Sequence, residues 1–375
     1  LNHTIMKKNS FLNVVFYMFL ALMVSVAACT KEGPAGPAGA DGTNGKDGVD
    51  GQDGVDGTAS CVECHDADAS LLTPEFQWSR SMHNAGTALA RSSNSSCSQC
   101  HSNQGFHLSN GNALGEGVAV NDPTTINCYT CHNIHKDYAP SDLDFTYPDE
   151  PEWHVTYGKT VSNDLGAGNL CSHCHQSRER DPVVDMNDLT IMYTGISTHY
   201  GPHYSPQANA LGGFGAYEIE GSMNYGDGTH VHGTASEDGC VSCHMRFSTA
   251  SGSGGHAMGV EAPGDLEQSC KQCHSSGSGA EALYESYYAD NFATIDHDGD
   301  VPTLNTTSRY TKLGDLLTAK GVYTKVVDSV DGYPVDVHYN INSGLEINGT
   351  LTAAMFNHRY LYQDHSHGIH NPGYS

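Results

Sequence analysis

Cys97-Ser98-Gln99-Cys100-His101 is one of six Cys-x-x-Cys-His copies in this chain of 375 residues, and the copies take up twelve of its thirteen cysteines. We number them motifs 1 to 6 in chain order: Cys61-Val-Glu-Cys64-His65, Cys97-Ser-Gln-Cys100-His101, Cys128-Tyr-Thr-Cys131-His132, Cys171-Ser-His-Cys174-His175, Cys240-Val-Ser-Cys243-His244 and Cys270-Lys-Gln-Cys273-His274. Cys-x-x-Cys-His is the attachment signature of c-type haem. The two thiols add to the porphyrin vinyl groups, and the histidine that follows supplies its imidazole to the iron.

Two other kinds of site also use Cys-x-x-Cys, namely zinc sites and redox dithiols. Zinc would require the cysteine pairs to combine into four-ligand sets, and neither alternative explains why a histidine follows every pair. We therefore predict six haem c groups, each bound through one cysteine pair. The proximal iron ligands would be His65, His101, His132, His175, His244 and His274.

The composition fits a chain whose core is built from cofactors. Leu, Ile, Val and Phe make up 66 of the 375 residues, about 18%, and the formal net charge is -26. Such a chain would normally be disordered, because it buries too little apolar surface to offset the entropy of ordering. Six apolar macrocycles would supply the missing core. We expect a multihaem cytochrome fold, mostly coil with short α-helices wrapped around six haems, little β-structure and some longer helix in the C-terminal tail.

The N-terminal region has the features of an export signal. Two lysines precede an apolar stretch over residues 11–26, and small residues then lead to Cys29. This pattern predicts a lipoprotein signal peptide over residues 1–29 and an outer-membrane lipoprotein anchored through acylated Cys29, with a plain membrane anchor as the alternative. Which face of that membrane the protein occupies, periplasmic or cell-surface, stays open.

Glycine then recurs at every third position from Gly33 to Gly57, which is the collagen pattern. With so few triplets a free triple helix would be marginal. A collagen-like tether over residues 30–57 is therefore favoured over a trimerising stalk.

Residues 58–375 form the expected hexahaem cytochrome domain. After motif 6 its residues 280–375 carry no haem motif, and we expect this tail to cap the haem array, with helices over residues 280–288 and 351–362. One acidic loop in the tail has carboxylates at alternate positions, Asp296, Asp298 and Asp300. It is a candidate calcium site, with a solvated acidic turn as the alternative.

Several sequence elements around the motifs contain further histidines. They are Trp78-Ser-Arg-Ser-Met-His83, His132-Asn-Ile-His135, His199-Tyr-Gly-Pro-His203, Gly254-Gly-His256 and Gly368-Ile-His370-Asn-Pro372. A further element, without histidine, is Gly168-Asn-Leu-Cys171 at the start of motif 4. With these elements the chain resembles the secreted and outer-membrane multihaem c-type cytochromes of anaerobic, mineral-respiring bacteria, over most of residues 60–375.

In proteins of that kind the histidines of these elements are commonly the second, distal ligands of the iron. The resemblance therefore implies six distal ligands: His83, His135, His203, His232, His256 and His370. His199 competes with His203, His230 competes with His232, and His173 is a further candidate for a neighbouring haem. Methionine is the other usual sixth ligand, but histidine is plentiful here. Met245 and Met258 are expected to pack against porphyrin.

Three functions compete. Iron with two histidine ligands has no position for a substrate, so the favoured function is electron transfer along the haem array, in anaerobic or extracellular respiration, without catalysis. The alternatives are a multihaem reductase of nitrite, hydroxylamine or a sulfur oxyanion, which needs one open haem site, and a subunit of a cytochrome filament. No motif has lysine in place of its histidine, as the nitrite reductases do.

The charge balance bears on partners. With 17 Lys and Arg against 43 Asp and Glu, nothing neutralises phosphates, so nucleic acid is excluded as the default partner. Only one long apolar run is present, which excludes a multi-span membrane protein. We expect redox partner proteins of basic surface, or mineral and other extracellular acceptors reached through cation bridges.

Overall fold

The structure is a computed structural model that describes residues 71–86, 88–111, 117–155, 161, 163–178, 180–221, 232, 238–246, 255–260, 269–270, 309–330, 333–366 and 370–371. All of them belong to one unit, residues 57–375. Motifs 2 to 5 lie wholly within this part of the chain. Motif 1, most of motif 6, the export signal, the Gly-x-y segment, the predicted helix at 280–288 and the acidic loop lie outside the described residues.

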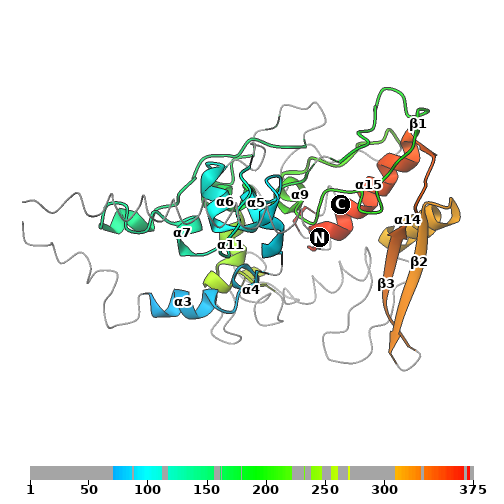
Figure 1. The fold of residues 1–375 in the computed structure, drawn as a ribbon. Helices are drawn as coiled ribbons and strands as arrows, with labels where there is room; N and C mark the ends of the chain where they lie inside the picture. The colour runs from blue at the N-terminus through cyan, green and yellow to red at the C-terminus, as the bar shows by residue number, and fades with distance from the viewer. Residues whose placement is uncertain are drawn as a thin grey trace, which may run out of the picture. The chain divides into compact units, whose positions relative to one another are not determined.

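Short helices dominate the region of the motifs, and a hairpin and two longer helices dominate the tail (Figure 1). In chain order the elements are α3 (Leu72–Trp78), α4 (Met82–Ala85), η1 (Leu89–Ser93), α5 (Ser98–His101), α6 (Asn103–Leu108), α7 (Cys128–Cys131), η2 (Pro140–Leu143), η3 (Gly166–Gly168), α8 (Asn169–Ser172), β1 (Met192–Tyr193), α9 (Gln207–Gly212), α11 (Cys240–His244), η4 (Gly255–Ala257), α14 (Arg309–Ala319), β2 (Tyr323–Val330), β3 (Tyr333–Ile341), β4 (Ile347–Asn348) and α15 (Gly349–Asp364).

A single helical turn forms at each of motifs 2 to 5: α5, α7 and α11 lie within motifs 2, 3 and 5, and α8 ends inside motif 4. Polar residues cap several of the short helices, because a turn this short leaves most of its N–H groups without a helical partner. Before α7, Asn127 accepts from the N–H of Tyr129, and the hydroxyl of Thr130 accepts from the Asn127 N–H, both at 3.0 Å. Before α6, Ser102 accepts from the N–H of Gly105 at 3.1 Å.

In the tail a β-hairpin packs against two helices. Strands β2 and β3 pair antiparallel, with Tyr323 opposite Ile341, and α14 packs against both β2 and α15. Helix α15 covers residues 351–362, where the sequence predicts a helix. The hairpin is an element that the sequence analysis does not name.

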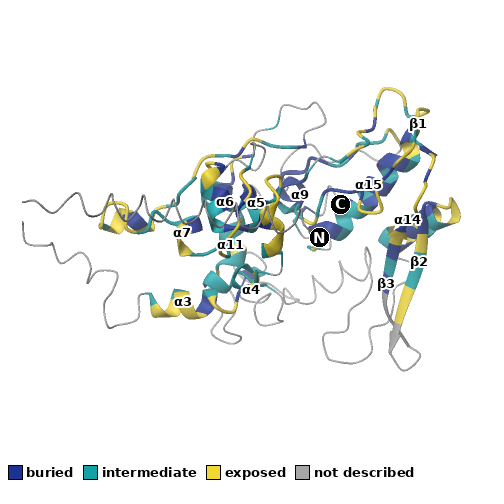
Figure 2. Cartoon of the chain, in the orientation of Figure 1, coloured by how far each residue is buried: buried dark blue, intermediate teal, exposed yellow. Residues whose placement is uncertain are grey.

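The main hydrophobic cluster joins this tail to the segment between motifs 4 and 5 (Figure 2). Its most buried large side chains include Tyr200, Tyr217, Phe356 and Tyr360. A second, much smaller cluster around Leu165 lies next to the motifs. Apolar side chains thus build a core where haem motifs are absent, in residues 176–239 and in the tail.

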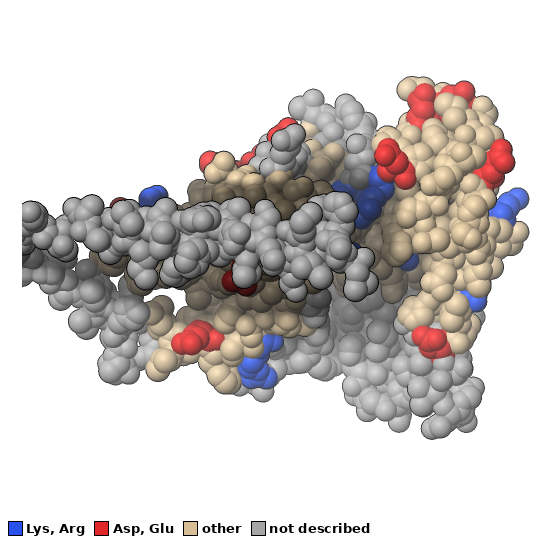
Figure 3. Space-filling view, viewed as in Figure 1, with Lys and Arg blue, Asp and Glu red and all other residues tan. Residues whose placement is uncertain are grey.

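Acidic side chains are spread over the face of the molecule in Figure 3, and Lys and Arg side chains occupy a few separate places. Among the described residues no helix is both long and apolar enough to cross a membrane, α15 being the longest at 16 residues. In the same part of the chain no three or more His, Cys, Asp or Glu side chains gather as a free metal ion would require.

Candidate axial-ligand pairs

Among the described residues, four pairs of histidines lie opposite one another, and each pair joins a motif histidine to a nominated distal one. The ring centroids are 6.1 Å apart for His175 and His83, 6.3 Å for His101 and His203, 6.3 Å for His132 and His256, and 6.2 Å for His244 and His370. Every described motif histidine thereby has a second imidazole opposite it. The partner comes in each case from a distant part of the sequence.

The spacing of the rings can be tested against the geometry of a metal held between two imidazoles. A metal–nitrogen bond to histidine is about 2.0–2.1 Å, and the ring centre lies about 1.1 Å beyond the nitrogen. Two such ligands on opposite sides place their ring centres about 6.2–6.4 Å apart. All four pairs fall within about 0.1 Å of this range, so the spacing of the rings matches that of two imidazoles bound to one iron.

In two of the rings, the hydrogen bond at Nδ1 shows which nitrogen is available to bind a metal. The bond made by one ring nitrogen fixes whether the other carries a proton or a lone pair. Nδ1 of His132 lies 2.6 Å from the carbonyl oxygen of Leu143, and Nδ1 of His244 lies 3.0 Å from that of Met258. Carbonyl oxygens only accept, so both Nδ1 atoms donate. Nε2 then carries the lone pair that a metal requires.

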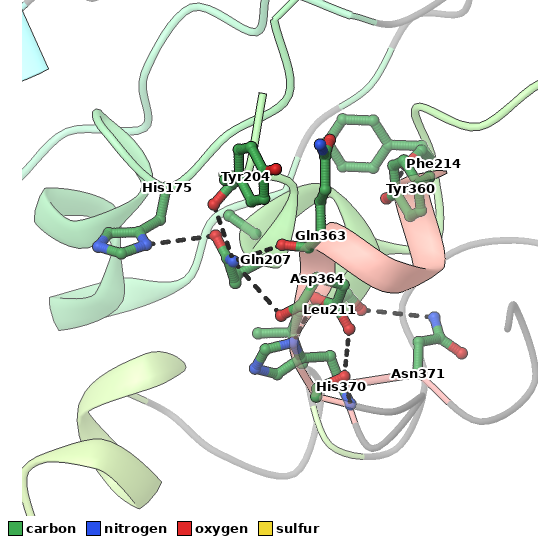
Figure 4. Close-up of polar contacts among 12 residues, drawn as sticks. His175, Tyr204, Gln207, Leu211, Phe214, Tyr360, Gln363, Asp364, His370 and Asn371 are labelled. Atoms are coloured by element: carbon green, nitrogen blue, oxygen red, sulfur yellow. Dashed lines mark hydrogen bonds and ion pairs between the residues drawn. The ribbon is translucent and has the colours of Figure 1, made fainter. Parts of the chain in front are cut away.

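The C-terminal end of α15 supports two rings from different pairs (Figure 4). The side-chain N–H of Gln207 donates to the carbonyl oxygens of Gln363 and Asp364, at 3.2 and 3.3 Å. This orients its Oε1 toward Nδ1 of His175 at 3.3 Å. Gln207 therefore links a proximal ligand candidate directly to the tail.

His370 is held by a carboxylate. Its Nδ1 lies 2.7 Å from Oδ1 of Asp364, a side chain that is 2% exposed. The hydroxyl of Ser366 also donates to this carboxylate and accepts from the backbone N–H of His370. A buried carboxylate on Nδ1 makes the imidazole a stronger donor to a metal.

Two further distal candidates, His83 and His203, have other partners at Nδ1. The Met258 sulfur lies 3.1 Å from Nδ1 of His83. A guanidinium nitrogen of Arg180 lies 3.0 Å from Nδ1 of His203. A guanidinium only donates, so Nδ1 accepts here, and an iron at Nε2 would require Arg180 to take another acceptor. Both His203 and Met258 have positive φ, 74° and 59°, a conformation that non-glycine residues adopt mainly where surrounding contacts impose it.

Burial keeps most of these rings neutral. It lowers the pKa of His83 to about 4, helped by the neighbouring His175, and lowers the pKa of His203 to about 4, helped by Arg178 and Arg180. At His370 burial also opposes the charged form, but the Asp364 carboxylate outweighs it and raises the pKa. Neutral imidazole is the form that binds metal.

The environment of Cys131 in motif 3 does not resemble that of a redox dithiol. Burial, followed by the effects of Cys171 and Cys128, raises the pKa of Cys131 to about 12. A reactive dithiol needs a lowered pKa, since the thiolate is the nucleophile. The arrangement therefore favours motif 3 as an attachment site.

Motif 4 lies between motifs 2 and 5. Its Cys174 sulfur is 3.9 Å from the carbonyl oxygen of Gln99 in motif 2, and the Cys174 and Cys100 thiols interact. The motif-5 sulfur of Cys240 lies 4.0 Å from the carbonyl oxygen of Gly168, just before motif 4, and it interacts with the Cys171 thiol. Groups bound to these cysteines would therefore be neighbours.

The other predicted site residues lie as follows. His135 stacks on Tyr138 with centroids 5.4 Å apart. His173 is buried against the rings of Phe106 and Tyr147. His199 is exposed beside Thr198, and it is His203 that faces His101. His232 is described and half-buried, and its competitor His230 lies outside the described residues.

Sequence reasoning missed the residues that orient the rings. Gln207 lies four positions after His203, Asp364 lies six positions before His370, and Met258 was expected only to pack against porphyrin. A polar side chain near a candidate ligand is a weak signal by itself. Its role depends on which segments meet in the fold.

Comparison with known proteins adds one match. Residues 26–143 match a family model described as outer membrane cytochrome MtrC/MtrF-like, domains II/IV. No curated protein and no solved structure matches the chain. The matched segment contains motifs 1 to 3. Over this part the chain is similar to an outer-membrane multihaem cytochrome family, and the match supports haem c as its cofactor.

Proposed function

We propose that this protein transfers electrons through six covalently bound c-type haems, each with two histidine ligands. The observation that carries the proposal is the set of four imidazole pairs at 6.1–6.3 Å. Haem iron bound on both faces exchanges single electrons and has no free coordination position for a substrate. The ligand pairs would be His175 with His83, His101 with His203, His132 with His256, and His244 with His370.

Two proximal ligands remain, His65 and His274, and two nominated distal ligands remain, His135 and His232. We propose that His135 and His232 are the distal ligands of the two haems whose proximal ligands are His65 and His274. Which of them binds which haem stays open. A reductase would need one of these two irons, since the histidines of motifs 2 to 5 already face a second imidazole. His173 is a competing ligand for the same two haems.

The contacts of motif 4 support a path for electrons. Because its cysteines touch those of motifs 2 and 5, the haem bound there would neighbour both others. We infer a branch of the array that runs from motif 2 through motif 4 to motif 5. The order in space therefore differs from the order in the sequence.

We place this array outside the cytoplasm, at the outer membrane. The likeness of residues 26–143 to an outer-membrane cytochrome family supports this location. Acylated Cys29 would anchor the chain, and the Gly-x-y segment would separate the haem domain from the lipid. Redox proteins or extracellular acceptors would then exchange electrons with the haem array.

We also propose that the acidic loop with Asp296, Asp298 and Asp300 binds calcium.

Two measurements on the purified holoprotein test the function. Mass spectrometry should find six covalent haems, and five after Cys61 and Cys64 are both replaced by alanine. Quantified EPR of the oxidised protein should find every iron low-spin. A high-spin iron in the unmodified protein would contradict pure electron transfer and favour a reductase with its open site at motif 1 or 6.

A further inference from the structure

The ligand pair of motif 5 has a buried negative charge beside it. The Asp364 carboxylate lies 2.7 Å from His370 and is 2% exposed. In so buried a position its charge is poorly screened. It stabilises the ferric form of a nearby iron, which carries one more positive charge than the ferrous form.

The ligand pair of motif 2 has the opposite surroundings. The Arg180 guanidinium lies 3.0 Å from His203, and the Arg178 guanidinium donates to the carbonyl oxygen of Ser96, directly before motif 2, at 3.0 Å. Both arginines are half-buried. Arg178 acts on both rings of the pair, His101 and His203. These cations disfavour the ferric form. Their charges act on the iron even where iron binding to His203 makes Arg180 donate to a different acceptor.

We propose that Asp364 and Arg180, together with Arg178, set a potential gradient along this branch of the array, lowest at motif 5 and highest at motif 2. The inference rests on the proposed function, because it requires haems at these motifs. Net local charge and hydrogen bonds to the ligands are the means by which a protein tunes haem potential. Asp364 and Arg180 act through the ligands and are positioning residues.

The gradient gives the branch a direction. Electrons move spontaneously from the lower to the higher potential, so each step oxidises the iron nearer motif 5 and reduces the one nearer motif 2. Motif 4 touches both ends and would transmit the electron between them. The C-terminal end of α15 then has two tasks, since it positions His175 through Gln207 and carries the charge that lowers the potential at motif 5.

Potentiometric titration of the full holoprotein, followed by optical spectra and EPR, tests this directly. Asp364→Asn should raise the midpoint potential of one low-spin haem, and Asp364→Glu should restore it. Arg180→Gln should lower the potential of a different haem, and Arg180→Lys should restore it. The controls Asp328→Asn and Arg309→Gln make the same changes of charge at exposed positions in the tail and should leave both potentials in place.

Equal shifts in the variants and their controls would overturn the gradient, as would no shift or a shift of the same haem at both positions. Should Asp364→Asn fail to load six haems, Arg180→Gln still decides the other end. The proposed function fails separately, through the haem count and spin state of the unmodified protein. Six low-spin haems without any variant-specific shift would leave the function standing and remove the gradient.

Discussion

His83 and His175 face each other with ring centroids 6.1 Å apart and an angle of 68° between their planes. His83 comes from a short helix before motif 2, and His175 ends motif 4. A metal between them would therefore join two distant segments. Since all four described pairs are of this kind, haem binding and tertiary structure are expected to depend on each other.

Replacing His83 with alanine should convert one iron to high spin without changing the haem count. Cys171 and Cys174 would still hold that haem covalently, but its distal ligand would be gone. Quantified EPR measures the change of spin state, and mass spectrometry measures the number of covalent haems. His199→Ala is the matched control, because His199 is exposed, and it should change neither. A wild-type spectrum from His83→Ala would disprove the pairing.

The sequence alone predicts the proximal ligands, because their positions follow from attachment chemistry that is local to five residues. It does not predict which distal histidine meets which motif. His256, for example, follows motif 5 but faces His132 of motif 3. That pairing depends on how segments far apart in the chain meet, and no local pattern encodes it.

The tail was harder to predict because its signals are mixed. In β2 the adjacent Val326 and Val327 break the alternation that usually identifies a strand. The dipeptide Asp331-Gly332 between the two strands is the local signal that could have identified the hairpin. Helix α15 was recognisable from the sequence, whereas its contacts with Gln207 and His370 were not.

Gln207→Leu should destabilise the link between motif 4 and α15. It removes the acceptor for His175 and the donor for two backbone carbonyls. Leaving such groups without partners costs about 1–3 kcal/mol each when they are buried. Chemical denaturation of the holoprotein measures the loss. Gln104→Leu makes the same change at a residue whose hydrogen bond to the carbonyl oxygen of Asp122 is exposed to solvent, so a smaller effect is expected.

Phe356→Ala should weaken the joint between the tail and the segment after motif 4. Phe356 is 1% exposed, and its ring contacts Tyr200 and Tyr217 at centroid distances of 5.8 and 5.1 Å. Truncating a buried phenylalanine costs about 3–5 kcal/mol. Thermal unfolding measures this loss. Leu316→Ala, at a side chain that is 63% exposed, should leave the melting temperature nearly unchanged, and equal effects would contradict the described core.

Acid should destabilise the tail through His358. This ring is fully buried, stacks on Tyr310 at 4.2 Å and contacts Tyr323 and Tyr339. Burial, and then the nearby Arg359, lowers its pKa from 6.5 to about 3. Between these two values the unfolded chain binds a proton that the folded chain does not. The free energy of unfolding therefore decreases as the pH falls from 6.5 towards 3, by up to about 1.4 kcal/mol per pH unit.

The variant His358→Leu isolates this contribution, because it removes the titrating group and keeps an apolar side chain in the cluster. Unfolding of both proteins should be measured between pH 4.5 and 7, a range chosen to include about two units of the window. The histidine ligands also take up protons on unfolding, but they do so equally in both proteins. The difference in slope thus reports His358 alone. Parallel stability curves would show that the ring is charged, or exposed, in the folded tail.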